Sequence, residues 1–109
     1  MAKTRQTIKR IVVHCKQILK TFGINVQKVI LFGSYARGNP GEYSDIDLVV
    51  ISKDFKNYNL RERLELLGLA AGKVFEPIEA LGYTPEEMVK EKKAHSFVGD
   101  IQNHACVEF

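Results

Sequence analysis

Cysteine is scarce in this sequence, since Cys15 and Cys106 are the only two among 109 residues. A small secreted domain held together by disulfides would usually carry more, so both thiols are expected to act as small buried apolar groups. His14 beside Cys15, or His104 near Cys106, could instead hold a metal, but neither pair has zinc-finger spacing.

Long apolar runs are also lacking, because none approaches the roughly 20 residues that a membrane-spanning helix needs. The basic N-terminus is followed by an apolar stretch that His14 and Lys16 interrupt, which does not match a signal peptide. These features favour a cytoplasmic protein without membrane contact. The length favours a single domain over residues 1–109.

Acidic residues are missing from the first part of the chain. Residues 1–41 contain eight Lys or Arg and no Asp or Glu, whereas residues 42–109 contain eight basic and thirteen acidic residues. Two solvated faces of opposite charge would explain this asymmetry. A positive flank that attracts phosphate-bearing ligands or an acidic partner would also explain it.

Hydrophobic periodicity predicts the secondary structure. A helical stripe that ends before Gly23 comprises Ile8, Ile11, Val12, Cys15, Leu19 and Phe22. A second helix is expected over residues 60–73, with one apolar side formed by Leu60, Leu64, Leu67 and Ala71. Strands are expected over residues 26–32, 45–51 and 74–81, the last with Pro77 moving it toward an edge or an irregularity.

The remainder of the chain is expected to be helical. Thr84 is followed by Pro85 at the first helical position and by Glu87 three residues on, which predicts a capped helix that runs to about His95. A last helix is expected through residues 98–101. The order of elements predicts an α/β (α+β) fold in which helices cover a small mixed sheet.

Residues 33–44 contain four glycines or prolines among polar residues, which predicts a loop with one short helical turn after Ser34. Gly33 lets the backbone turn sharply and lets a ligand approach the main chain. The hydroxyl of Ser34, the amides that follow it and the forked guanidinium of Arg37 all suit phosphate oxygens. By itself, a strand-to-helix turn with a capping serine would explain this motif equally well.

Asp45-Ile46-Asp47 is the second chemically informative segment. Alternate residues of a strand share a face, so both carboxylates are expected on one side while Ile46, Leu48 and Val50 enter the core. Adjacent carboxylates repel each other, and a divalent cation such as Mg²⁺, which takes oxygen ligands, removes that conflict. A solvated strand face with two acids is the alternative.

The combination is more specific than either part: Gly33-Ser34, ten residues, then Asp45-x-Asp47. The segment GSYARGNPGEYSDIDLVV resembles the signature of the polymerase-beta-like nucleotidyltransferase superfamily, and within it the minimal nucleotidyltransferases. The likeness includes Arg37-Gly38 and Ser44 before the first aspartate. The length and the order of elements fit as well, so the resemblance spans nearly the whole chain.

This resemblance implies roles for the motif residues. Gly33 and Ser34 would hold the triphosphate of ATP or another nucleoside triphosphate, and Asp45 and Asp47 would bind two Mg²⁺ ions. The transferred group would be a nucleoside monophosphate, with AMP from ATP the favoured case. The enzyme would be a nucleotidyltransferase, and a protein adenylyltransferase in particular.

The family usually has a third carboxylate on a neighbouring strand, which helps to hold one metal and can serve as the base for the attacking hydroxyl. Glu79 is the favoured candidate, since it stands five residues before the Thr84-Pro85 cap. Glu76 is the alternative, and a third possibility is that neither binds metal. Many members carry Asp at this position, so the longer Glu leaves the metal geometry open.

The acceptor is the least determined part of the interpretation. Larger family members carry further domains for it, whereas about 30 residues follow the third predicted strand here. Minimal nucleotidyltransferases resemble the antitoxin half of toxin–antitoxin systems, whose partner is a helical HEPN-type ribonuclease that some of them modify with AMP on a tyrosine. The resemblance therefore implies such a partner.

Other functions stay open from the sequence. The chain could be a nucleotide-binding module that acts by physical association with its partner, or it could modify nucleic acids or small molecules. No RNA-binding motif supports direct nucleic-acid binding. The sequence leaves the nucleotide, the acceptor and homo-oligomerisation undetermined.

Overall fold

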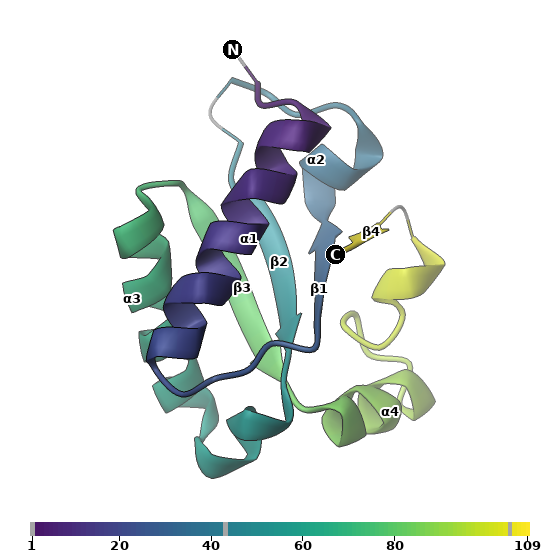
Figure 1. Ribbon diagram of the computed structural model, residues 1–109. Helices are drawn as coiled ribbons and strands as arrows, with labels where there is room; N and C mark the ends of the chain where they lie inside the picture. Colours follow the sequence, from purple (N-terminus) through teal and green to yellow (C-terminus); the bar gives the residue numbers. More distant parts are fainter. Residues whose placement is uncertain (1, 43, 105) are drawn as a thin grey trace.

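The computed structural model describes residues 2–42, 44–104 and 106–109. Its elements follow in the order α1 (Arg5–Thr21), β1 (Lys28–Phe32), α2 (Gly33–Arg37), β2 (Ile46–Ile51), the 3₁₀ turn η1 (Lys53–Asn57), α3 (Leu60–Val74), β3 (Ile78–Tyr83), α4 (Pro85–Lys93), the 3₁₀ turn η2 (Ile101–Asn103) and β4 (Val107–Glu108). Figure 1 shows helices packed around a central twisted sheet. The predicted mixed sheet with helical cover is confirmed.

The sheet has the strand order β3-β2-β1-β4. β1 is antiparallel to both of its neighbours, whereas β2 and β3 are parallel. A parallel pair needs a crossover connection, and α3 lies in that connection. The crossover brings β3 alongside β2, so side chains of the two strands face each other.

The sheet carries an apolar cluster on each face. The first cluster includes Ile46, Leu48 and Val50 of β2, packed against residues of α1 and α3 such as Ile8, Val12, Leu19, Leu67 and Ala70. The second comprises Ile30, Val49, Ile51 and Ile101. Alternation along β2 therefore points odd-numbered residues away from α1 and α3.

Two predicted helix ends are confirmed, Gly23 after α1 and the capping box of α4. α1 begins at the Thr4 cap, whose hydroxyl accepts a hydrogen bond from the Thr7 amide, and Gly23 follows it with φ 84°. At α4, Thr84 and Glu87 form the expected reciprocal capping box, with Pro85 in the first turn. Within the described residues, no helix is both long and apolar enough to cross a bilayer.

Cys15 lies in the first apolar cluster, and burial raises the pKa of its thiol to about 11. Cys106 is half-buried and packs against the second cluster. The prediction that the two thiols are small packed groups is confirmed for Cys15.

The predicted apolar side of α3 is confirmed for Leu67, which is buried, and wrong for Leu60 and Leu64. Leu60 and Leu64 are 64% and 53% exposed, although both were expected to face the core. The buried positions of α3 are Arg63, Leu67, Ala70 and Val74. Residues three and four apart share one face of a helix, so Arg63, Leu67, Ala70 and Val74 form the buried face of α3. Arg63, which forms hydrogen bonds inside the protein, occupies this face, and the neighbouring Leu64 is exposed.

The start of β3, the expected last helix and β4 also differ from prediction. β3 begins at Ile78 rather than at residue 74, because α3 continues through Val74 and Phe75 closes it in a left-handed conformation with φ 60°. The expected last helix is reduced to the short turn η2. β4, which pairs with β1, was not predicted, since two residues carry no periodic signal.

Candidate functional site

The turn between β1 and β2 is built around glycines. The chain leaves β1 in an extended conformation at Phe32, enters α2 at Gly33 with φ 74°, and leaves it at Gly38 with φ 80°. A Cβ atom at Gly33 would collide with the carboxylate of Asp47. Glycine at this position therefore permits both the turn and the close approach of Asp47 to the main chain.

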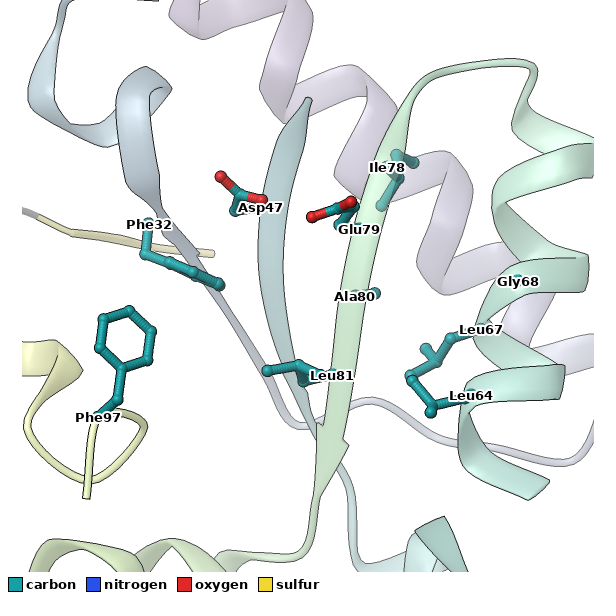
Figure 2. A pocket seen from close by; sticks show the side chains of 10 residues that line it. All are labelled: Phe32, Asp47, Leu64, Leu67, Gly68, Ile78, Glu79, Ala80, Leu81 and Phe97. Carbon is teal, nitrogen blue, oxygen red and sulfur yellow. The ribbon is translucent and has the colours of Figure 1, made fainter. Parts of the chain in front are cut away.

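Asp47 and Glu79 face each other across neighbouring strands. They are direct partners in the parallel register of β2 and β3. Figure 2 shows the two carboxylates on the same side of the sheet, with the Glu79 oxygens directed toward β2. The expectation that Asp47 points away from Ile46 and Leu48 is confirmed, because those two residues are buried in the first cluster while Asp47 lines a cavity.

The surroundings of Asp47 disfavour its negative charge. Partial burial raises the pKa of its carboxyl group above the ordinary value, and the nearby charges of Glu79 and Asp45 raise it further, whereas Arg37 lowers it. The Asp47 carboxylate forms no ion pair or hydrogen bond with the other described residues. A carboxylate in this state is a candidate ligand for a cation.

The other predicted carboxylates are placed differently. Asp45 precedes β2 and is exposed. Glu76 precedes β3, and its carboxylate pairs with the Lys3 ammonium at 3.2 Å. Of the two candidates for a third acid, Glu79 is the one that lies beside Asp47. Among residues 2–42, 44–104 and 106–109, no three His, Cys, Asp or Glu side chains stand together as a finished metal cluster.

Two adjacent cavities meet at Asp47. One, of about 490 Å³, is lined by the predicted phosphate-binding residues Gly33, Ser34 and Arg37 together with Phe97, Ile101 and His104. The other, of about 500 Å³, is largely apolar and includes Glu79, Leu64, Leu67 and Leu81. Asp47, Phe32 and Phe97 line both cavities. Asp47 therefore lies between a polar and an apolar cavity. Figure 2 shows it among the residues of the apolar one.

Sequence reasoning missed the C-terminal wall of this site. Phe97 and His104 come from the segment after α4, where no motif marks them. Their separation from Ile101, four and three residues, is only a weak helical signal, and the sequence suggested His104 solely as a metal ligand with Cys106. Tertiary folding, rather than local pattern, brings this segment beside Ser34 and Arg37.

The basic N-terminal segment lies mostly away from the site. α1 packs on the face of the sheet that carries Ile46 and Leu48, opposite the face of Asp47. Among the described basic residues of segment 1–41, Arg37 alone lines the polar cavity. The exposed cations of α1 are thus not placed to contact a ligand bound there.

Comparison with known proteins identifies the family. A family model described as a nucleotidyltransferase domain matches residues 8–105, and the chain belongs to this family.

Curated relatives give a narrower likeness. Three proteins of Methanocaldococcus jannaschii bear the name "putative protein adenylyltransferase". One is 58% identical over 40 residues, which is 37% of this chain and 25% of that protein. Another is 47% identical over 66 residues, covering 60% of this chain and 64% of the relative. The third is 39% identical over 46 residues, covering 42% and 44%. Each match spans less than two thirds of the relative's own length.

Solved structures confirm the fold. A "putative nucleotidyltransferase" from Sulfolobus solfataricus superposes with a TM-score of 0.52 at 22% identity, covering 83% of this chain and 84% of that one. A structure described as a toxin–antitoxin with AMP-PNP gives a TM-score of 0.51 at 21% identity, covering 77% and 66%. At these identities the likeness concerns the fold alone.

Proposed function

We propose that the chain is a metal-dependent nucleotidyltransferase that transfers a nucleoside monophosphate, AMP from ATP, to a hydroxyl acceptor. The observation that carries the proposal is the pairing of Asp47 and Glu79 across β2 and β3, beside the turn at Gly33 and Ser34. Membership of the nucleotidyltransferase family supports the same chemistry.

The donor set suits magnesium. Asp47 and Glu79 present hard oxygen donors side by side. Partial burial and the nearby charges of Glu79 and Asp45 raise the pKa of Asp47, and a bound divalent cation would favour its ionised form. Asp45, exposed just before β2, is near enough for its charge to raise the pKa of Asp47 and would add a third oxygen donor when metal binds. Two bound Mg²⁺ ions would stabilise the attacking and leaving oxygens of the transfer.

The chain's own residues would position the reactants. Ser34 lines the polar cavity, and its hydroxyl forms no hydrogen bond with the described residues, so it is available to a phosphate oxygen. Arg37 adds a permanent positive charge to the same cavity. Glu79 would accept the proton of the acceptor hydroxyl as that oxygen attacks the α-phosphorus and pyrophosphate leaves.

The acceptor is proposed to be a partner protein. Relatives that match part of this chain are named protein adenylyltransferases, and a structural neighbour is a toxin–antitoxin bound to AMP-PNP. We therefore propose that the chain acts in the cytoplasm as the antitoxin of a helical HEPN-type ribonuclease. A tyrosine hydroxyl of that ribonuclease would receive the AMP.

Intact-mass spectrometry tests this function. A small helical protein encoded next to this chain is incubated with it, ATP and Mg²⁺, and each transferred AMP should add about 329 Da to the partner. An unmodified partner that binds tightly would instead identify a binding module. If the partner neither binds nor gains mass, the antitoxin role is wrong and the acceptor must be sought among nucleic acids or small molecules.

A further inference from the structure

Phe97 is an exposed aromatic residue at the mouth of the candidate site. Its side chain is 66% exposed, yet it lines both the polar and the apolar cavity. Its ring makes an edge-to-face contact with Phe32, with 5.9 Å between centroids and 69° between planes. Figure 2 shows the ring projecting toward Phe32, on the side of the site away from α3.

The backbone around Phe97 is held in place by several contacts. The Ser96 hydroxyl donates to the Glu91 carbonyl at 3.3 Å and accepts from the Gly99 amide at 3.0 Å. The Asp100 amide donates to the Ser96 carbonyl at 2.9 Å. Gly99 is buried so close to the main chain of Glu91 that a Cβ atom there would collide with it. This turn therefore presents a large apolar ring outward from a fixed position.

The composition of the polar cavity indicates what the ring would meet. Its lining combines Ser34 and Arg37, which suit phosphates, with Phe97 and Ile101, which suit a flat apolar group. A nucleotide combines a polyphosphate and a planar base in one molecule. A nucleotide that fills this cavity with its phosphates near Ser34 would therefore bring its base to Phe97.

We propose that Phe97 is the platform on which the base of the bound nucleotide stacks. This inference rests on the proposed function, since it takes a nucleoside triphosphate as the ligand. Every nucleobase has a π-face, so stacking contributes affinity and positioning rather than choice between bases. Phe97 is thus a positioning residue for the nucleotide.

The inference is tested by comparing MgATP, which has a base, with magnesium tripolyphosphate, which has none. Phe97→Ala should weaken the binding of MgATP by roughly 5- to 150-fold, the range observed when a base loses an aromatic partner. The affinity for magnesium tripolyphosphate, which has no base, should not change. Val89→Ala is the matched control, because Val89 is 54% exposed on α4 and lines neither cavity.

Phe97→Trp provides a second readout, because the sequence contains no tryptophan. The new indole should retain MgATP affinity within a few-fold of the wild-type value. Its fluorescence should be quenched by MgATP and left unchanged by tripolyphosphate. Titration calorimetry and fluorescence then report the same contact independently.

Three results would overturn the inference: unchanged MgATP affinity in Phe97→Ala, equal losses for MgATP and tripolyphosphate, or a loss confined to the KM for the acceptor. Equal losses would show that the ring supports the cavity wall, and an acceptor effect would place it in the acceptor site. Failure of the wild-type protein to bind either ligand would instead refute the proposed function.

Discussion

Asp47 combines three constraints in one side chain. It contacts the main chain at Gly33, it faces Glu79 across the sheet, and its charge is disfavoured by partial burial. If Asp45 and Asp47 bind magnesium, the double substitution Asp45→Asn/Asp47→Asn should abolish nucleotide transfer and weaken Mg²⁺-dependent ATP binding. Turnover and calorimetry measure the two effects, and wild-type turnover in this variant would refute the site assignment.

The same substitution should not harm the fold. Because the folded-state pKa of Asp47 is raised, the protonated form is favoured by folding, and stability falls as pH rises from the ordinary value of 3.8 through the raised pKa. At pH values above the raised pKa, the negative charge of Asp47 lowers the stability of the folded state, and substitution by Asn removes this charge. Without metal, the double variant should melt at the wild-type temperature or slightly higher at pH 7, and added Mg²⁺ should raise the wild-type value more.

Gly33 and Ser34 should differ in their sensitivity to substitution. Gly33→Val places a β-branched side chain at φ 74° and against Asp47, so the turn and the carboxylate must both move. Ser34→Ala removes one hydroxyl and no amide, and is expected to lower turnover by roughly 10- to 1000-fold. In steady-state kinetics, Gly33→Val should have a lower turnover than Ser34→Ala. Wild-type activity in Gly33→Val would rule out this loop as the phosphate cradle.

Among the secondary-structure elements, α3 and α4 are joined by a buried arginine. Arg63 is 5% exposed and its Nε donates to the carbonyls of Phe55 and Tyr58 at 3.0 Å each. Its guanidinium also reaches the carbonyl of Gly82 and both carboxylate oxygens of Glu87. One side chain therefore connects η1, α3, β3 and the first turn of α4.

Arg63→Met should lower the free energy of unfolding by about 2–4 kcal/mol, because it leaves several carbonyls and a carboxylate without their donor. Urea denaturation measures the change. Arg61→Met is the matched control, since Arg61 is exposed and pairs with Glu65 four residues on, and its loss should cost less than about 0.5 kcal/mol. Equal effects of the two substitutions would contradict the role assigned to Arg63.

The pH dependence of this contact has a defined sign. The Arg63 hydrogen bond holds the pKa of Glu87 below its ordinary value of 4.5. The stabilisation is therefore present above pH 4.5 and is lost as pH falls through the lowered pKa. The stability difference between wild type and Arg63→Met should shrink over that acidic range.

Elements with strong local signals were predictable from the sequence. Three such signals lie within short stretches of sequence: the apolar stripe of α1, the capping box at Thr84 and Glu87, and the alternation around Asp47. The inward face of α3 was not predictable, because burial of Arg63 depends on carbonyls from η1 and β3. β4 likewise exists through its pairing with β1.

The candidate site divides in the same way. The glycine turn and the paired acids stand in one short motif, so their proximity could be anticipated. Glu79 was favoured over Glu76 by the family resemblance and by its position before the Thr84-Pro85 cap. Strand periodicity could not choose between them, whereas the register of β2 and β3 places Glu79 opposite Asp47. Phe97 and His104 depended on how the segment after α4 folds back, which no local pattern encodes.

Across the whole molecule, the exposed positive charges of α1 are separated from the candidate site at Asp47. Arg5, Lys9, Arg10 and Lys20 are exposed on α1, which covers the sheet face opposite Asp47. If the proposed partner is acidic where it docks, raising NaCl should slow association markedly, because exposed charges are screened beyond about 10 Å at 0.1 M salt.

Charge reversal tests this arrangement. Lys9→Glu with Arg10→Glu should slow association with the partner while leaving ATP affinity unchanged, as measured by stopped-flow mixing and calorimetry. Lys53→Glu with Lys56→Glu is the matched control, since both residues are exposed on η1. Association that is insensitive to both salt and the α1 reversal would show that α1 is a solvated face without a docking role.

The contact between Gly33 and Asp47 also constrains how such a chain can evolve. A side chain at position 33 is excluded for as long as Asp47 is retained, whereas loss of Asp47 removes the collision but leaves φ 74°. The two positions should therefore drift together rather than independently. In descendants that have abandoned catalysis, Gly33 should be replaced first by asparagine or aspartate, which tolerate positive φ, and only after position 47 has become small.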